Sequence, residues 1–322
     1  MTTAAPALAL FLPPAASSMA PRVDLLFDLL LLACALVTFG LFATIFYFVV
    51  KYREGSPANR TPSGGGAWRL EATWTAIPAV VFLVFFVWAA KLFVDLSVPP
   101  PDAAPIYVIG KQWMWKIQHP EGVAEIDALH VPLGRPVVLT MTSEDVIHDF
   151  FVPAFRVKKD VLPGTYTRLW FRPTLAGRYP FYCSQYCGTQ HSGMRGVVEV
   201  MEPRAYETWL AQNAAGRTVV QAGARLFQAQ ECSACHAPGG RGPRLDALYG
   251  SMVRLADGRT ARADDAYLRA SLLQPEKDLV QGFDPIMPTY QGRLTEMNVF
   301  ELLAYIRSLQ DAGPGTTGPE VR

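Results

Sequence analysis

The residue pattern with the clearest chemistry is the run Cys232-Ser233-Ala234-Cys235-His236. A C-x-x-C-H run is the attachment signature of c-type haem, in which two thioethers anchor the vinyl groups and the histidine takes one axial position on the iron. Redox dithiols and half of a zinc site share the C-x-x-C portion, but no second C-x-x-C lies nearby. The run therefore predicts one covalently bound haem c.

An electron-transfer haem of this kind needs a second axial ligand, usually Met or His. No histidine follows His236, so the candidates are Met252, Met287 and Met297. Flanking prolines hold Met287 in an extended loop that can present its sulfur to the iron. Met297 falls in a helix-like run where core packing is the better interpretation, and Met252 follows the histidine closely. The sequence therefore favours Met287.

A second group of metal-binding side chains lies in a Gly-containing loop and comprises Cys183, Cys187, His191 and Met194. Soft sulfur and imidazole ligands select copper. Two thiolates can bridge a pair of copper ions if a further ligand completes the second ion, and His148 is available for that role. The alternative interpretation is a Cys183–Cys187 disulfide with an incidental histidine.

Two long apolar segments precede these motifs. Neither the stretch 29–50 nor the stretch 72–90 contains a charged residue, and at ~1.5 Å per residue each can cross a ~30 Å hydrocarbon layer. Buried core helices are the alternative, which the lack of a polar face disfavours. We predict a transmembrane helix hairpin over 24–96. Basic residues lie in the intervening loop, so the positive-inside rule places this loop in the cytoplasm and everything after about residue 96 outside.

Composition changes divide the rest of the chain. The segment 1–23 is rich in Ala and Pro; it has no basic n-region and Pro13-Pro14 interrupts it, so its processing as an export signal is left open. Short β-branched and aromatic runs punctuated by Gly and Pro predict an antiparallel sandwich or barrel over 104–203. A linker over 204–217, a helical domain over 218–312 and a disordered tail over 313–322 complete the expected organisation.

The overall composition limits the function classes. Lys and Arg number 29 against 28 Asp and Glu, half of the residues are hydrophobic and 18% are charged. This excludes a disordered chain and argues against nucleic acid as the main partner. The cysteines form one single and two close pairs, which for a chain of 322 residues indicates cofactor sites rather than a disulfide framework.

The stretches around these motifs resemble subunit II of the haem-copper cytochrome c oxidases. The resemblance is carried by Trp113, by 130–159 and 182–200, and by the transmembrane hairpin, and it extends from about residue 24 to 310. The C-terminal part makes the chain similar to oxidases that carry their own cytochrome c. The resemblance implies a multi-domain membrane protein, with a transmembrane α-hairpin, an all-β cupredoxin-like barrel and an all-α class I cytochrome c domain.

The resemblance also implies a dinuclear copper centre, CuA. Cys183 and Cys187 would bridge the two ions, and the terminal and weak ligands would be His148, His191, Met194 and the backbone carbonyl of Gln185. Many members have Glu at position 185, whose side chain also reaches a magnesium ion. Because a neutral amide is a poorer ligand for a hard cation, we do not expect magnesium to bind through this chain.

Two further residues gain roles from the resemblance. Trp113 corresponds to the aromatic through which electrons from cytochrome c reach the copper centre, with ordinary packing as the alternative. Glu71 corresponds to the carboxylate at the mouth of a proton channel, with a charge at the membrane boundary as the alternative. His119 and His130 lack partner cysteines and are expected to be structural, and Cys34 is expected to be a small buried hydrophobe.

These observations predict an electron relay. A donor would reduce the haem, and the electron would pass to CuA and then to a separate catalytic subunit that reduces oxygen. The expected partners are oxidase subunit I, subunit III, cytochrome c or another periplasmic donor, and the lipid bilayer of a bacterial plasma membrane. The alternatives are a free-standing membrane-anchored electron shuttle and an accessory subunit of a nitric oxide reductase.

Overall fold

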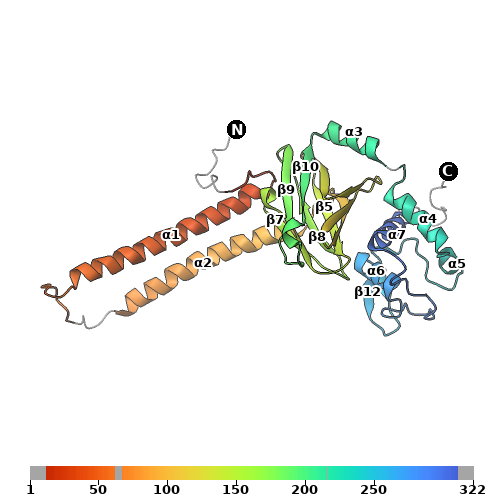
Figure 1. Cartoon of the computed structure of the whole chain (residues 1–322). Helices are drawn as coiled ribbons and strands as arrows, with labels where there is room; N and C mark the ends of the chain where they lie inside the picture. The colour runs from red at the N-terminus through yellow and green to blue at the C-terminus, as the bar shows by residue number, and fades with distance from the viewer. Residues whose placement is uncertain (1–11, 62–66, 215, 311–322) are drawn as a thin grey trace.

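The chain forms two long helices, a β-sheet domain and a helical domain, in that order (Figure 1). The computed structural model describes residues 12–61, 67–214 and 216–310. The tail predicted over 313–322 and the first part of the predicted N-terminal segment lie outside the described residues.

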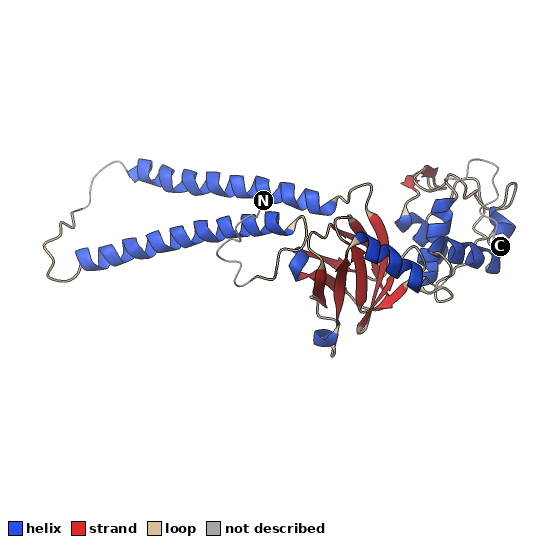
Figure 2. Cartoon of the chain, turned by 90° about the horizontal axis from the view of Figure 1, so that it is seen from above, coloured by secondary structure: helices blue, strands red, loops and turns tan. Residues whose placement is uncertain are grey.

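The two helices run side by side away from the β-sheet domain (Figure 2). Helix α1 spans Ala20–Lys51 and α2 spans Ala67–Ser97, and both are long and apolar enough to cross a membrane. Most of their apolar side chains are exposed within this chain, as expected for helices that are surrounded by lipid. Cys34 on α1, expected to be a small buried hydrophobe, is likewise exposed within this chain.

The β-sheet domain consists of two five-stranded sheets packed on one core. The first sheet has the order β3 (Ala124–Ile126), β2 (Met114–Gln118), β1 (Ala104–Lys111), β5 (Val137–Ser143) and β8 (Thr167–Phe171). The second has the order β4 (Ala128–Pro132), β10 (Arg195–Met201), β9 (Gly177–Cys183), β6 (His148–Val152) and β7 (Val157–Val161). The pairing is not wholly antiparallel as expected, since β1 pairs with β5 and β10 with β4 in parallel.

The residues just before α1 belong to this domain. The Ala16 N–H donates to the Ala154 carbonyl at 2.9 Å, and Ser17 forms an isolated bridge with Pro173. Ala16 and Ser17 are fully buried. An ion pair of 2.7 Å between Arg156 and Asp24 fastens the beginning of α1 to the same surface.

The C-terminal domain is helical with one small hairpin. Helix α3 (Pro203–Asn213) occupies most of the segment expected to be a linker. The domain then contains α4 (Val219–Ala229), α5 (Ser233–His236), β11 (Met252–Arg254), β12 (Thr260–Arg262), α6 (Asp265–Leu273) and α7 (Glu296–Ser308). Thr218 and Thr295 begin α4 and α7 with capping boxes.

The helical domain packs against the first sheet through α7 and β1 (Figure 1). Tyr107 and Ile109 of β1 share a buried cluster with Phe300 of α7, and the Tyr107 and Phe300 ring centroids are 4.7 Å apart. Arg168 of β8 donates to the buried Asp265 carboxylate of α6 at 2.9 Å. The two domains therefore meet in an apolar contact with an ion pair beside it.

Candidate copper and haem sites

The predicted copper ligands converge at one end of the second sheet. His148 begins β6 and Cys183 ends β9, and these strands pair with Phe150 opposite Cys183. The chain then turns through the loop that carries Cys187 and through η3 (His191–Gly193), before β10 begins just after Met194. Strand pairing thus places His148 beside a loop that follows it by more than thirty residues.

The ligand atoms of this group lie at short distances from one another. The sulfurs of Cys183 and Cys187 are 3.8 Å apart, and both residues are free thiols. A disulfide bond is about 2.05 Å long, so this separation leaves the sulfurs unbonded. The remaining distances are 3.9 Å from Cys183 Sγ to His148 Nδ1, 3.5 Å from Cys187 Sγ to His191 Nδ1, 3.8 Å from Cys187 Sγ to Met194 Sδ, and 3.1 Å from Cys183 Sγ to the Gln185 carbonyl.

Asp145 orients the buried histidine of this site. Its Oδ1 accepts from His148 Nε2 at 2.8 Å and from the Val146 N–H at 2.7 Å, and its Oδ2 accepts from the Gln112 N–H at 2.7 Å. Burial would raise the pKa of Asp145, but these hydrogen bonds outweigh it and lower that pKa. With the proton held on Nε2, the Nδ1 lone pair of His148 faces the sulfurs and is free for a metal. Sequence reasoning missed Asp145.

The two thiols have very different acidities without a metal. Burial would raise the pKa of Cys183, but its contact with the His148 imidazole and a hydrogen bond from the Asp149 backbone lower it to about 7. Burial and the negative charge on Cys183 raise the pKa of Cys187 to about 12. The site therefore carries one thiolate readily, while a second thiolate needs a bound cation. Sulfur and imidazole donors of this kind suit copper, so the residues present fit a copper centre.

Trp113 lies directly on the ligand loop. Its indole Nε1 donates to the Cys187 carbonyl at 3.2 Å, and the Gln112 side chain donates to the same oxygen at 2.8 Å. A Cβ at Gly188 would come within 3.3 Å of the Trp113 ring, so the loop approaches the indole closely at this glycine.

Glu71 lies far along the chain from this site, exposed in the second turn of α2.

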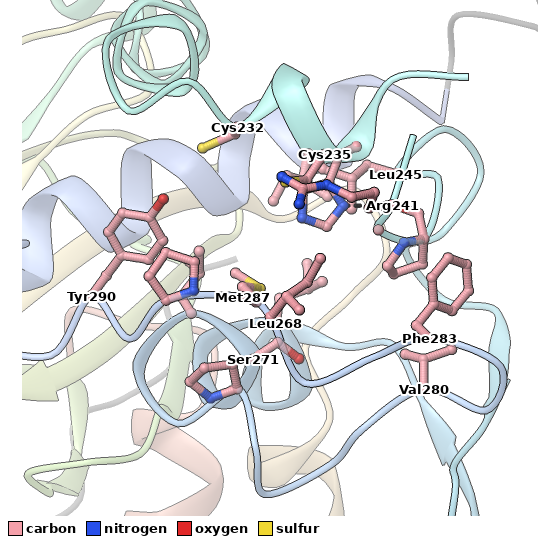
Figure 3. A pocket seen from close by; sticks show the side chains of 18 of the residues that line it. Cys232, Cys235, Arg241, Leu245, Leu268, Ser271, Val280, Phe283, Met287 and Tyr290 are labelled. Carbon is pink, nitrogen blue, oxygen red and sulfur yellow. Dashed lines mark hydrogen bonds between the residues drawn. The ribbon is translucent and has the colours of Figure 1, made fainter. Parts of the chain in front are cut away.

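The C-x-x-C-H run borders a cavity of about 360 Å³ in the helical domain. Cys232, Cys235, His236 and Met287 all line it, and Met287 faces the cysteines in the view of Figure 3. His236 Nδ1 donates to the Pro243 carbonyl at 2.7 Å, which leaves Nε2 for an iron. The remaining lining is mostly apolar and includes Leu268, Leu272, Leu302 and Ile306. A large flat apolar cofactor with an iron at its centre fits these residues.

The other two candidate methionines lie elsewhere. Met252 is in β11 and is 65% exposed. Met297 is in α7 and packs against the cluster of Tyr107 and Phe300 between the domains. Met287 is thus the one of the three that the structure brings to the cavity.

The two remaining histidines form a polar cluster with one carboxylate. Glu125 lies 2.7 Å from His119 Nε2 and 2.5 Å from His130 Nδ1. Tyr206 of α3 hydrogen-bonds to His119 Nδ1 at 3.2 Å, and the Trp209 ring stacks on His130 with centroids 4.2 Å apart. Their nitrogens are thus engaged in contacts that fasten α3 to the β-sheet domain, in keeping with the structural role expected.

Comparison with known proteins identifies the family. The model of the cytochrome c oxidase subunit II transmembrane domain matches residues 5–92, and that of its periplasmic domain matches 121–201. A cytochrome c oxidase subunit 2 from Thermostichus vulcanus is 30% identical over 259 residues, covering 63% of this chain and 79% of the relative. The chain belongs to the cytochrome c oxidase subunit II family. The resemblance and the fold class predicted from the sequence are confirmed.

Other matches extend this assignment. The cytochrome c family model matches residues 220–310, so this subunit II carries a fused cytochrome c domain. The cytochrome c oxidase subunit 2 of Alkalihalophilus pseudofirmus is 28% identical over 308 residues, covering 90% of this chain and 89% of the relative. The crystal structure of the periplasmic domain of subunit II from Bradyrhizobium japonicum is 28% identical and has a TM-score of 0.35, with 36% of this chain and 96% of that chain covered.

The family assignment also confirms the class of enzyme. Subunit II is part of an oxidoreductase complex, the cytochrome c oxidase, and such a complex implies partner subunits and a cytochrome c donor. The subunit II domain implies copper and the cytochrome c domain implies haem. The transmembrane family match and the two apolar helices indicate a membrane-anchored chain with a periplasmic domain.

Proposed function

We propose that this chain relays electrons from a donor, through a covalent haem c and a dinuclear CuA centre, to the haem-copper catalytic subunit that reduces oxygen. The observation that carries the proposal is the convergence of His148, Cys183 and Cys187, whose ligand atoms all lie within 4.8 Å of one another. Copper and iron supply one-electron chemistry, and the chain's own residues hold, orient and shield them.

In the copper site, each side chain has a defined task. Cys183 and Cys187 would bridge two ions, and His148 and His191 would bind them through Nδ1. Met194 and the Gln185 carbonyl are the weak ligands proposed for completing the site. The burial of both cysteines excludes water, and the Asp145 carboxylate fixes the imidazole of His148.

In the haem site, Cys232 and Cys235 would form the thioethers, and His236 and Met287 would hold the iron. The Pro243 carbonyl holds the proton of His236 on Nδ1. The mostly apolar lining would surround a bound haem with a low-polarity environment, which together with the axial ligands affects its potential.

The remaining assignments concern the surroundings. Trp113 is proposed as the point where electrons from an external cytochrome c enter, and Glu71 as the mouth of a proton channel. Subunits I and III are the proposed partners, in a bacterial plasma membrane that the hairpin 24–96 crosses twice. The domain limits proposed are 104–203 for the copper domain and 218–312 for the cytochrome c domain. Magnesium at Gln185 is not proposed, since that side chain is neutral and exposed.

The test is metal, haem and spectroscopic analysis of the full chain purified in detergent. The expected result is two copper ions and one covalent haem per chain, with an electron paramagnetic resonance signal spread over both coppers. Cys187→Ser should abolish the shared signal, whereas Cys34→Ser, at the exposed cysteine of α1, should leave it unchanged. A single copper, a signal confined to one nucleus, or a Cys183–Cys187 disulfide in the loaded chain would refute the dinuclear assignment.

A further inference from the structure

Strand β1 lies between the copper ligand His148 and helix α7, the helix that also lines the haem cavity. Its side chains Tyr107 and Ile109 face the helical domain and are buried there. The next residue, Gly110, faces the other way, toward the copper site. A Cβ at Gly110 would lie 2.8 Å from Cδ2 of His148, so the backbone of β1 rests against the imidazole. The four consecutive residues Tyr107–Gly110 of β1 therefore connect the domain contact to a copper ligand.

Helix α7 provides the corresponding connection on the haem side. Leu302 and Ile306 line the cavity beside the C-x-x-C-H run. Phe300, from the same helix, packs its ring on Tyr107 with centroids 4.7 Å apart. One helix thus forms both a wall of the haem cavity and the contact with β1. From the cavity to His148, the path consists of covalent bonds and packed side chains.

Polar contacts hold the two domains in one orientation. Asp265 is 4% exposed and accepts from Arg168 of the β-sheet domain and from Arg307 of α7, each at 2.9 Å. Arg269 of α6 donates to the Gly164 carbonyl, also at 2.9 Å. Charge-assisted hydrogen bonds to a buried carboxylate are among the stronger polar contacts. These hydrogen bonds therefore stabilise the packing of α7 against β1.

Trp113 lies outside this path. Within the described part of the chain, its hydrogen bond is to Cys187 and its packing is against the core of the β-sheet domain. An electron arriving at Trp113 would enter the site through the Cys187 loop, whereas one arriving through β1 would enter at His148. The two routes therefore end on different ligands.

We propose that the electron moves from the haem to the copper centre through the contact of Phe300 with Tyr107 and then along β1 to Gly110 and His148, and not through Trp113. In this step one electron leaves the ferrous haem, which becomes ferric, and reduces the mixed-valence copper pair; no bond is made or broken and no proton moves. Electron tunnelling is faster through bonded and tightly packed atoms than across gaps. The proposal rests on the proposed function, because it needs both cofactors in this chain.

Two tyrosines provide a matched test. Tyr107 and Tyr166 both pack against Phe300, with ring centroids 4.7 and 4.8 Å away, but only Tyr107 belongs to β1. The haem of the full-length, loaded chain is reduced by a light flash with a ruthenium photoreductant. Reoxidation of the haem and reduction of the copper centre are then followed by their visible absorption bands. Tyr107→Leu should slow the electron transfer from haem to copper several-fold, whereas Tyr107→Phe, which keeps the ring, should transfer at the rate of the unmutated chain. Tyr166→Leu should slow the transfer much less than Tyr107→Leu.

Two other results would overturn the proposed route. Equal slowing by Tyr107→Leu and Tyr166→Leu would show that the contact only holds the domains together, and would overturn the route. Slowing by Trp113→Phe as large as that by Tyr107→Leu would overturn it as well. If Tyr107→Leu does not fold, Phe300→Leu removes the ring on the opposite side and should slow the transfer equally. Failure of the proposed function shows separately, as missing copper or haem in the unmutated chain.

Discussion

Removing the carboxylate of Asp145 should weaken copper binding without removing a copper ligand. Asp145→Ala deletes the acceptor of the His148 Nε2 proton at 2.8 Å and of the Gln112 and Val146 N–H groups at 2.7 Å each. The imidazole then loses its fixed tautomer and orientation. Partners of this kind typically contribute 10 to 100-fold in metal affinity, so we expect a loss of about 1.4–2.8 kcal/mol in copper binding.

The assay is competition for copper against a chelator of known affinity, followed by the visible and paramagnetic resonance spectra of the full chain. Glu144→Gln is the matched control, because Glu144 is the neighbouring carboxylate and pairs with Lys111 and Lys116 rather than with His148. Asp145→Asn keeps an acceptor oxygen and should lie between the wild type and the alanine variant. Copper affinity unchanged in Asp145→Ala, or reduced equally in Glu144→Gln, would refute the reasoning.

Three further changes have defined outcomes. Met287→Leu should leave the haem covalently attached but remove the spectral signature of sulfur ligation, whereas Met297→Leu should retain it; visible spectra of the two variants decide. Burial would raise the pKa of Glu125, but hydrogen bonds from two histidines outweigh it and lower that pKa below 4.5. The ionised carboxylate therefore contributes its full stabilisation above about pH 4.5. This contribution is lost as the pH falls through the lowered pKa. Glu125→Gln should therefore reduce the free energy of unfolding at neutral pH by roughly 2 kcal/mol, with a smaller difference from wild type in acid, measured by denaturant unfolding. Gly223→Ala should lower the melting temperature of the cytochrome c domain, because the new Cβ would lie 2.0 Å from the Glu301 carbonyl, whereas Gly40→Ala, with nothing within 4 Å, should not.

Local motifs carried most of what the sequence could predict about the sites. Cys232, Cys235 and His236 are neighbours in the chain, and Cys187 follows Cys183 by four residues, so their spacing alone suggested a common cofactor. His148 was harder, because β6 and β9 must pair before it meets the loop. The fold class followed from hydrophobic periodicity and from the family resemblance, and the family match confirms it.

Long-range packing could not be predicted from the sequence. The role of Asp145 depends on a backbone N–H at Gln112, which belongs to a different strand connection. The parallel pairing of β1 with β5 and the position of α3 on His119 depend on how the chain crosses between sheets. The contact of Tyr107 with Phe300 joins two domains and leaves no local signal, because each residue alone resembles an ordinary buried aromatic.

The pairing of the segment before α1 with the β-sheet domain has a consequence for biogenesis. Ala16 and Ser17 precede the first helix, yet they are buried against Ala154, Phe155 and Pro173, which follow the second. The leading end of the chain and the domain translated after α2 must therefore reach the same side of the lipid barrier. Until the segment before α1 has been translocated, the domain lacks the contacts made by Ala16 and Ser17, so its folding cannot be complete before that step.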